Sequence, residues 1–367
     1  MRKHAPNKQT KGNIMIRTAF KFATVIAGFV LAGSSALHAD SFGPSNSRPT
    51  VSAHDQKGPV VTHLAEFGSD DFNAGSTIGP DGALYVTDGS VGAVLRIDRR
   101  DGRVSTYATG LPPKAFQGGD IGGPVDVAFV GRTAYVLVTL VSGLVFGEPF
   151  DNGNPNAKNG LYRIERDGSS TLIADIGQWS IDHPPQPAFF VDTGAQFAMQ
   201  PYFGGFLVTD GHHNRVLWVS LQGSIHEVAT FENVVPTGLE TIAGFVFVTQ
   251  MGPIPHVPED GKVLALVPRG EPLELASGAS MLIDVERGPR GRLYGISQGQ
   301  WDGVGEGSRA LPNTGRLVVV GRHGELTPVV NGRGQELVLD RPVSLEIVGN
   351  TAYVVSVTGD VYRVEGL

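Results

Sequence analysis

The sequence restates one short pattern six times, and this repetition constrains the fold more than any other feature. The pattern is an apolar run ending in Val-Thr-Asp, then glycine, then a run that contains arginine and a second turn. It is clearest in residues 83–102 and 206–223. Looser copies occupy residues 135–139, 245–250, 293–298 and 353–356. Short β-type runs and glycine turns at a spacing of about 40 to 60 residues are typical of a radial β repeat. We therefore predict an all-β fold, a six-bladed β-propeller with four-stranded antiparallel blades.

The first complete unit shows how each blade is assembled. Its four strands are predicted at residues 76–78, 84–87, 94–98 and 104–108. The first turn is Gly-Pro-Asp-Gly (79–82), in which proline presets φ and glycine takes positive φ without steric cost. We label the strands of a blade a to d, from the innermost to the outermost.

The last unit lacks its outermost strand. Residues 341–367 supply strands a, b and c only, and they end where the other units continue. Residues 60–67, near the other end of the chain, match the sequence pattern of residues 223–231, which are predicted to contain a strand d. We therefore predict that residues 60–67 pair with residues 360–364 and close the ring.

The N-terminal segment has the pattern of a secretory signal peptide. Six basic residues precede an apolar run at 22–31 and the small residues at 32–36, which predicts cleavage near Ala36 or Ala39. Met15 is an alternative start of the chain. The predicted organisation is a signal peptide at 1–39, a flexible leader at 40–58 and one propeller at 60–367. The expected location is outside the cytoplasm, either periplasmic or secreted.

Charge and cysteine content exclude several classes of function. Residues 1–39 hold six of the 29 Lys and Arg and none of the 36 Asp and Glu, so their removal changes the formal charge from −7 to −13. Nucleic acid and anionic lipid are therefore poor partners. The chain has no cysteine, so no disulfide can form. We expect a monomer with no membrane span after cleavage.

The long connections between strands all fall between strands b and c or between one blade and the next. In a meander blade these two connection types lie at the same end of the ring, so they form one face, which we call the long-loop face. Long loops on a rigid scaffold are where binding and catalysis usually occur. This pattern predicts that a small molecule or a protein partner binds there. The residues proposed to contact it are Asp120, Phe150, Trp179, His183, His212, His213, His256 and Trp301; further aromatic residues in these loops are Phe116, Phe146, Phe189 and Phe190.

Acidic residues at the inner strands suggest a second kind of site. Asp88 and Asp210 end strand b in two blades, and the innermost strands carry further carboxylates. Carboxylates directed toward one axis would raise one another's pKa or hold a hard cation such as Ca²⁺. The proposed metal ligands are Asp88, Asp126, Asp210, Glu240 and Asp284. By alternation, Asp126, Asp284 and Ser344 are predicted to share one register, and Glu240, Glu286 and Glu346 another.

The stretches 118–128, 133–140 and 207–215 resemble the ScyD/ScyE family of secreted proteins. The resemblance covers about residues 60–367 and implies an exported six-bladed propeller, without catalytic residues to carry over. More distantly, the repeats resemble NHL propellers and the SMP-30/gluconolactonase group, whose enzymes use a central metal. Residues 71–75 lack the Glu-Gly-Pro of those enzymes. A streptogramin-lyase-like activity would implicate His256 and Glu259.

Two functions remain open from the sequence. The first is a propeller that binds a small molecule or a protein through the long-loop face. The second is a calcium-type, metal-dependent hydrolase or lyase with carboxylates at the central channel. The sequence does not decide whether the protein is an enzyme.

Overall fold

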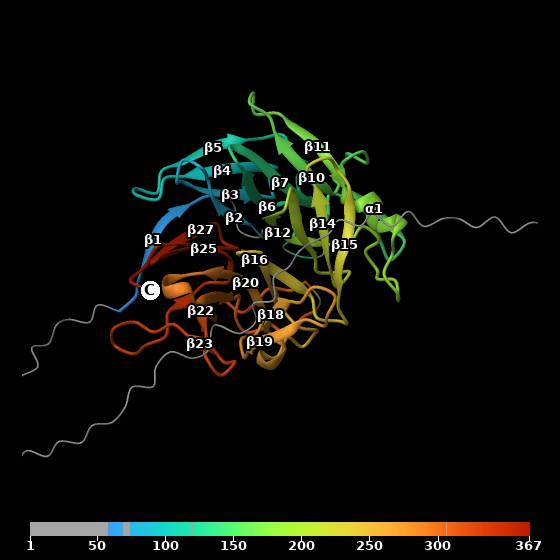
Figure 1. Cartoon of the computed structure of the whole chain (residues 1–367). Coiled ribbons are helices and arrows are strands. Elements are labelled where there is room, and N and C mark those ends of the chain that lie inside the picture. The colour runs from blue at the N-terminus through green and yellow to red at the C-terminus, as the bar shows by residue number, and fades with distance from the viewer. Residues whose placement is uncertain (1–57, 69–73, 118, 120, 306) are drawn as a thin grey trace, which may run out of the picture. The chain divides into compact units, whose positions relative to one another are not determined.

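Each repeat folds into one four-stranded antiparallel sheet, and the six sheets are arranged as the blades of a ring (Figure 1). The computed structural model describes residues 58–68, 74–117, 119, 121–305 and 307–367. The fold is therefore the six-bladed β-propeller that the repeats predict. The signal peptide and nearly all of the leader predicted from the sequence lie outside the described residues.

The blades follow the chain in order, with the innermost strand first. Blades 1 to 3 consist of β2 (Ser76–Ile78), β3 (Leu84–Asp88), β4 (Ala93–Ile97) and β5 (Val104–Ala108); β6 (Gly123–Val130), β7 (Thr133–Thr139), β10 (Gly160–Ile164) and β11 (Ser170–Asp175); and β12 (Gln196–Tyr202), β13 (Gly205–Asp210), β14 (Arg215–Ser220) and β15 (Ile225–Thr230). Blades 4 to 6 consist of β16 (Pro236–Ile242), β17 (Phe245–Gln250), β18 (Lys262–Leu266) and β19 (Leu273–Ser277); β20 (Leu282–Arg287), β21 (Leu293–Ser297), β22 (Gly315–Val320) and β23 (Leu326–Pro328); and β25 (Pro342–Val348), β26 (Thr351–Ser356), β27 (Asp360–Glu365) and β1 (Val60–Glu66).

The first blade shows why the turn residues predict the positions of the strands. All four strands begin and end within one residue of the predicted positions. In the first turn, Gly82 has a φ of +78°, and the backbone N–H of Ala83 donates to Oδ1 of Asp81 at 3.1 Å. Glycine and aspartate thus supply the conformation and the hydrogen bond that the turn requires.

The hydrophobic core is divided among the interfaces between neighbouring blades. Among the described residues it forms six clusters, one at each interface. Every residue of β3 and of β13 is buried, because strand b is covered by a neighbouring blade on both faces. The apolar run of the repeated pattern is thus a packing signal.

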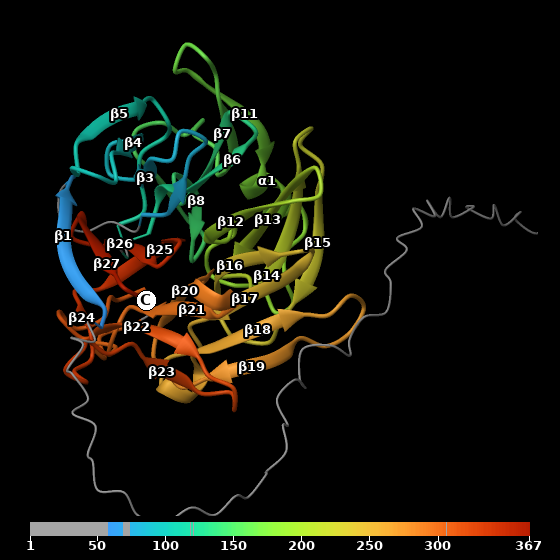
Figure 2. The same cartoon turned by 60° about the vertical axis from the view of Figure 1, so that its left-hand side comes forward.

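The ring is closed by the two ends of the chain. β1 pairs antiparallel with β27, with Val61 opposite Val364 and Glu66 opposite Asp360. The backbone N–H of Phe67 also donates to the carbonyl of Gly359 at 3.0 Å. Figure 2 shows the blue β1 beside the red strands of the last blade. The predicted closure is confirmed.

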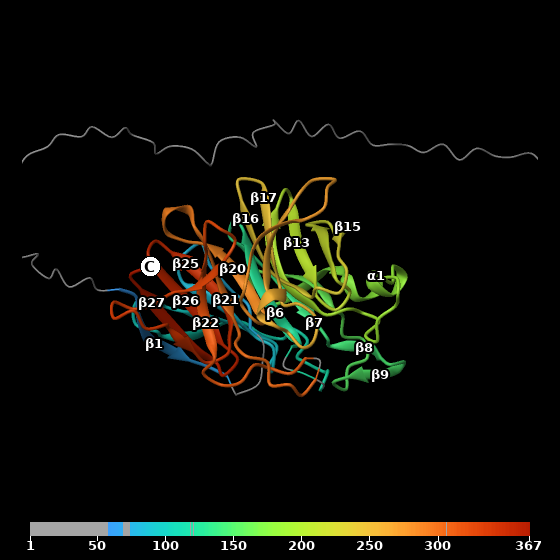
Figure 3. The ribbon, with the colours of Figure 1, turned by 90° about the horizontal axis from the view of Figure 1, so that it is seen from below.

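The connections on the long-loop face contain the secondary structure that the repeats do not predict. They include the hairpin of β8 (Ser142–Val145) and β9 (Glu148–Asp151), the helix α1 (Ile176–Asp182), the 3₁₀ turn η1 (Pro258–Asp260) and β24 (Val338–Leu339). Figure 3 shows the β8–β9 hairpin on the side of the ring opposite the turn between β16 and β17. Among the described residues, no helix is long and apolar enough to cross a membrane.

Candidate functional site

A cavity of about 170 Å³ lies where the innermost strands of all six blades meet. Its wall is formed by residues of β2, β6, β12, β16, β20 and β25 and by the residues just before β2. We call it the central channel. Among the described residues that line it are five carboxylates, contributed by four blades, and no Lys, Arg or His. These carboxylates are Asp126, Glu240, Asp284, Glu286 and Glu346.

A repeated β-bulge determines which side chains of the innermost strands share a register. In β6, β20 and β25 the first paired residue after the bulge is Asp126, Asp284 and Ser344, so these three share a register as predicted. Glu286 and Glu346 share the register two residues later. Glu240, opposite Phe247, has the same place in β16, and Gly238 takes the place of Asp284 there. The prediction that Glu240, Glu286 and Glu346 share a register is therefore confirmed.

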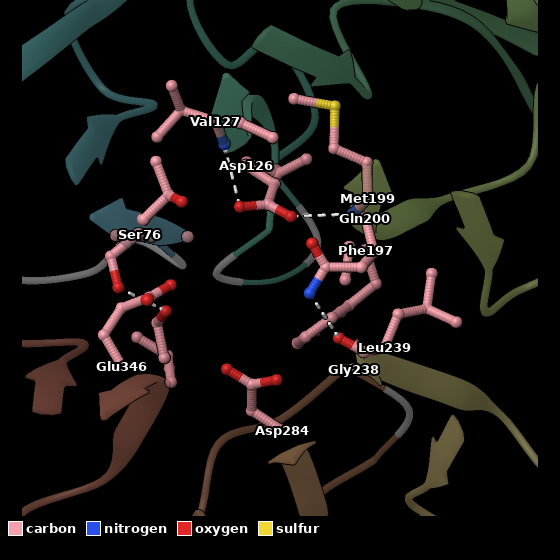
Figure 4. A pocket seen from close by; sticks show the side chains of 18 of the residues that line it. Ser76, Asp126, Val127, Phe197, Met199, Gln200, Gly238, Leu239, Asp284 and Glu346 are labelled. Carbon is pink, nitrogen blue, oxygen red and sulfur yellow. Dashed lines mark hydrogen bonds between the residues drawn. The ribbon is translucent and has the colours of Figure 1, made fainter. Parts of the chain in front are cut away.

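Asp126 and Asp284 each bridge two neighbouring blades, and Figure 4 shows both side chains with the two hydrogen bonds of Asp126. Asp126 accepts hydrogen bonds from the backbone N–H of Val127 at 2.8 Å and from that of Met199, in the next blade, at 2.7 Å. Asp284 repeats this arrangement with Val285 at 2.8 Å and with Leu345 at 2.9 Å. Both oxygens of each carboxylate are therefore committed to backbone donors.

The carboxylates of Asp126 and Asp284 fit only because glycines lie next to them. A Cβ at Gly238 would lie 2.5 Å from Oδ1 of Asp284, and a Cβ at Gly75 would overlap Oδ1 of Asp126. Glu240 makes the equivalent bridge from blade 4 to blade 5, since it accepts from the backbone N–H of Thr241 at 2.6 Å and of Arg287 at 2.9 Å. The carboxylates thus fasten the inner strands to one another.

Enclosure raises the pKa of four of these carboxyl groups. Burial, with a further contribution from the charge of Asp284, raises the pKa of Asp126 well above its ordinary value, against the effect of its two backbone donors. Burial raises the pKa of Asp284 to about 7. The pKa values of Glu286 and Glu346 are also raised well above the ordinary value, first by burial and then by neighbouring carboxylates. The channel therefore favours carboxyl groups that carry a proton.

This electrostatic arrangement predicts an unusual dependence of stability on pH. A carboxyl group whose pKa is higher in the folded chain binds more protons when folded, so its contribution to stability falls as the pH rises from about 4 towards about 7. We expect the thermal midpoint to be higher at pH 5.5 than at pH 7.5.

Replacing one channel carboxylate with an amide should have a similar effect at fixed pH. Glu286→Gln removes a like charge without changing the size of the side chain, so we expect it to raise the midpoint at pH 7.5 by about 3 to 6 °C, the shift for a gain of about 1 to 2 kcal/mol. Glu271→Gln, at an exposed position, is the matched control and should leave the midpoint at pH 7.5 unchanged. A lower midpoint for Glu286→Gln would show that the charge stabilises the channel.

The predicted metal ligands are divided among different parts of the molecule. Asp126, Glu240 and Asp284 lie together in the central channel, whereas Asp88 and Asp210 do not line it. Asp88 accepts from the backbone N–H of Ser90 at 3.1 Å and from its hydroxyl at 2.6 Å, so it caps a turn. Within the described residues, three ligand atoms within 4.8 Å of one another occur at a different place, outside the channel. The channel carboxylates do not fit a resident cation well.

Asp210 belongs to a buried ion pair that anchors the loops of blade 3. Nε of Arg215 donates to Oδ2 of Asp210 at 3.1 Å, and both side chains are almost completely buried. Arg215 also donates to the carbonyl of His183 at 2.8 Å and to Oγ of Ser180 at 2.9 Å. Burial would raise the pKa of Asp210, but the hydrogen bond and charge of His213 and the charge of Arg215 hold it below the ordinary value. Asp210 therefore positions α1 and the residues after it.

The long-loop face carries a continuous cluster of rings, which we call the aromatic cluster. It consists of Phe146, Phe189, Phe190, His212 and His213, from three different connections. Phe146 is stacked on Phe190, with ring centroids 4.5 Å apart and planes inclined by 10°, and His212 meets the edge of Phe190 at 4.4 Å. Phe146 is 78% exposed. One face of the cluster is thus open to solvent.

The other predicted ligand-binding residues form separate contacts. Trp179 is stacked on His183 at 4.4 Å and lies under the guanidinium of Arg215. His256 is buried and meets the edge of Trp301 at 5.6 Å. Phe150 packs on Phe116 at 5.5 Å. None of these three ring pairs lines the central channel, Glu259 lies in η1 away from it, and Asp120 lies outside the described residues.

No family model matches this chain, and no curated protein matches its sequence. The resemblance to the ScyD/ScyE family therefore stays a prediction. Solved structures are similar in fold. A gluconolactonase from Xanthomonas campestris is 13% identical, with a TM-score of 0.54, and the match covers 92% of this chain and 99% of that one.

Two further solved structures give the same result. The PQQ-bound aldose sugar dehydrogenase of Streptomyces coelicolor is 12% identical, with a TM-score of 0.53, over 84% of this chain and 98% of its own. A protein of unknown function from Bacteroides thetaiotaomicron is 10% identical, with a TM-score of 0.54, over 84% of this chain and 76% of its own. At such identities the likeness concerns the fold alone, so the function has to be argued from this chain's own residues.

Proposed function

We propose that this protein is an exported β-propeller that binds a small molecule with a flat apolar face at the aromatic cluster. The observation that carries the proposal is the assembly of the aromatic cluster from three connections on the long-loop face. Exposed, preorganised rings stack on flat apolar or sugar rings at a low cost in conformational entropy. Export rests on the basic and apolar pattern of the N-terminal residues.

The backbone at Phe146 supports a binding role. Phe146 and Gly147 form the turn of the β8–β9 hairpin, with φ of +50° and +83°. A bulky residue at positive φ costs free energy and persists only where its surroundings hold it. Here the backbone N–H of Phe146 donates to the carbonyl of Phe190 at 2.8 Å, and Val145 forms a β-bridge with Val191. The strain presents an aromatic ring to solvent at a fixed place.

A screen of small molecules tests this proposal. Compounds with flat ring faces, including nucleobases, flavonoids and sugars, would be tested for their effect on the thermal midpoint of the purified protein. For any compound that raises it, hydrogen exchange should show protection in residues 142–151, 188–192 and 211–214. Protection confined to the turns on the opposite face would contradict the proposal, and a screen with no hits would favour a protein partner.

A second candidate function is a hydrolase or lyase that acts in the central channel. The observation in its favour is the pKa of about 7 at Asp284, because a general acid or base works best when its pKa is near the operating pH. In this candidate Asp284 would transfer the proton. We place no step on a metal ion, since Asp126 and Asp284 meet backbone donors with both oxygens.

A panel of lactones and cyclic esters tests this second candidate. Turnover should follow a titration near pH 7 and should fall at least a hundredfold in Asp284→Ala, as expected for loss of general acid–base catalysis. Turnover that survives Asp284→Ala, or no turnover across the panel, would rule out this role for Asp284.

A further inference from the structure

The outermost strands of most blades carry a β-bulge that has a specific geometric effect. In the pairing of β1 with β27 it falls at Leu64, between His63 and Ala65. In a regular strand, residues three apart point to opposite faces; one extra residue at a bulge restores them to the same face. His63 and Glu66 therefore project on the same side, and Asp360 lies directly opposite Glu66.

Two other blades use the same geometry to form an ion pair. In blade 3 the bulge falls at Val228, and Glu227, just before it, reaches Arg215 at 3.8 Å. In blade 4 the bulge falls at Leu275, and Glu274 meets Nζ of Lys262 at 2.8 Å. In blades 3 and 4, the two positions that correspond to His63 and Asp360 thus hold one acidic and one basic side chain, which carry opposite charges.

Blade 6 has a surplus of negative charge at the same place. Nε2 of His63 lies 2.7 Å from Oδ1 of Asp360, and one ligand atom each of His63, Glu66 and Asp360 can lie within 4.8 Å of the others. Like charges directly opposite each other destabilise a pair of strands. In the described part of the chain, neither Glu66 nor Asp360 forms an ion pair with lysine or arginine. The cation that the protein itself supplies in blades 3 and 4 is missing here.

The carboxylate of Asp360 is already oriented for a further ligand. Oγ1 of Thr358 donates to Oδ2 of Asp360 at 2.7 Å, which leaves Oδ1 on the side of His63. A hydrogen-bonded carboxylate and an imidazole whose ring is held in place, here edge-on to Tyr362 at 6.0 Å, are typical of prepared metal ligands.

We propose that His63, Glu66 and Asp360 bind one divalent transition-metal ion of the zinc class. One imidazole nitrogen and two carboxylate oxygens suit Zn²⁺ and similar ions, with water completing the coordination, whereas Ca²⁺ takes oxygen ligands. The ion replaces the hydrogen bond between His63 and Asp360. It would join residues 297 positions apart in the sequence, at the seam where β1 closes the ring.

Metal binding and thermal unfolding of tag-free protein, freed of metal with a chelator, test this site. We expect one Zn²⁺ per chain by equilibrium dialysis and, at about a hundred times the dissociation constant, a midpoint raised by about 5 °C. His63→Gln and Glu66→Gln, which change exposed side chains, should weaken zinc binding at least tenfold. His226→Gln, an exposed histidine on the outermost strand of blade 3, is the matched control and should bind zinc unchanged.

Three results would overturn this site. The first is zinc binding as tight in His63→Gln as in the unmutated protein, and the second is no zinc binding below about 1 mM. The third is a midpoint that responds to Ca²⁺ as strongly as to Zn²⁺ and keeps that response in His63→Gln.

Discussion

Removal of residues 58–67 is expected to abolish the single cooperative unfolding transition of this protein. These residues supply β1, the outermost strand of blade 6, and Ala65 and Phe67, which are buried against blades 6 and 1. Without them β27 becomes an unpaired edge, and the interface that closes the ring is opened to water. We expect thermal unfolding followed by circular dichroism to become broad and to begin at least 10 °C lower.

A peptide of residues 58–68 provides the control for this deletion. It should restore the transition when added to the truncated protein, because strand addition to an open edge reuses the native hydrogen bonds. The same peptide with Ala65→Asp should fail, since it would bury a charge. A truncated protein that melts like the intact one would show that the ring does not depend on β1.

Arg215→Met is expected to lower the free energy of unfolding by about 3 to 5 kcal/mol, as removal of one partner leaves a buried charge uncompensated. Arg215 is completely enclosed, and it holds Asp210, His183 and Ser180 together. Urea unfolding monitored by tryptophan fluorescence would measure the loss, because Trp179 lies under the guanidinium at 4.9 Å.

Arg96→Met is the matched control. Arg96 pairs with Asp81 at 2.7 Å, but both side chains are about a third exposed, so its loss should cost less than about 1 kcal/mol. The pH dependence of stability gives a second check. Because the pKa of Asp210 is depressed, its contribution to the free energy of unfolding is present above the ordinary aspartate pKa and is lost as the pH falls below about 4. A loss in Arg215→Met that equals the loss in Arg96→Met would contradict the role of this pair.

The fold could be predicted because its signals are local and repeated. Gly82 and Asp81 define a turn within four residues, and the apolar residues 84–86 begin the buried strand β3. The ring closure could also be predicted, because the sequence of residues 60–67 is similar to that of β15. The β8–β9 hairpin was missed, since it has no counterpart in the other repeats.

The sites were harder to predict because they depend on contacts between distant residues. Asp88 and Asp210 end equivalent strands, yet one caps a turn and the other meets Arg215; the sequence around the two looks alike. The bulge that brings His63 and Glu66 to the same side of β1 inserts a single residue, which alternation alone does not reveal. The sequence places the aromatic residues in the loops, but which of them contact one another depends on the packing of three connections.

The measurement that tests the binding proposal most directly compares two phenylalanines on opposite faces. Phe146 and Phe203 both sit in two-residue hairpin turns at positive φ and are 78% and 62% exposed, but Phe203 lies in the turn between β12 and β13 and packs on Tyr202. Titration calorimetry would give the dissociation constant of the strongest compound from the screen for the unmutated protein, Phe146→Ala and Phe203→Ala.

The proposal predicts that Phe146→Ala raises the dissociation constant at least tenfold, about 1.4 kcal/mol, as loss of a central aromatic contact does. Phe203→Ala should leave it unchanged. An unchanged constant in Phe146→Ala, or an equal loss in both variants, would contradict binding at the aromatic cluster.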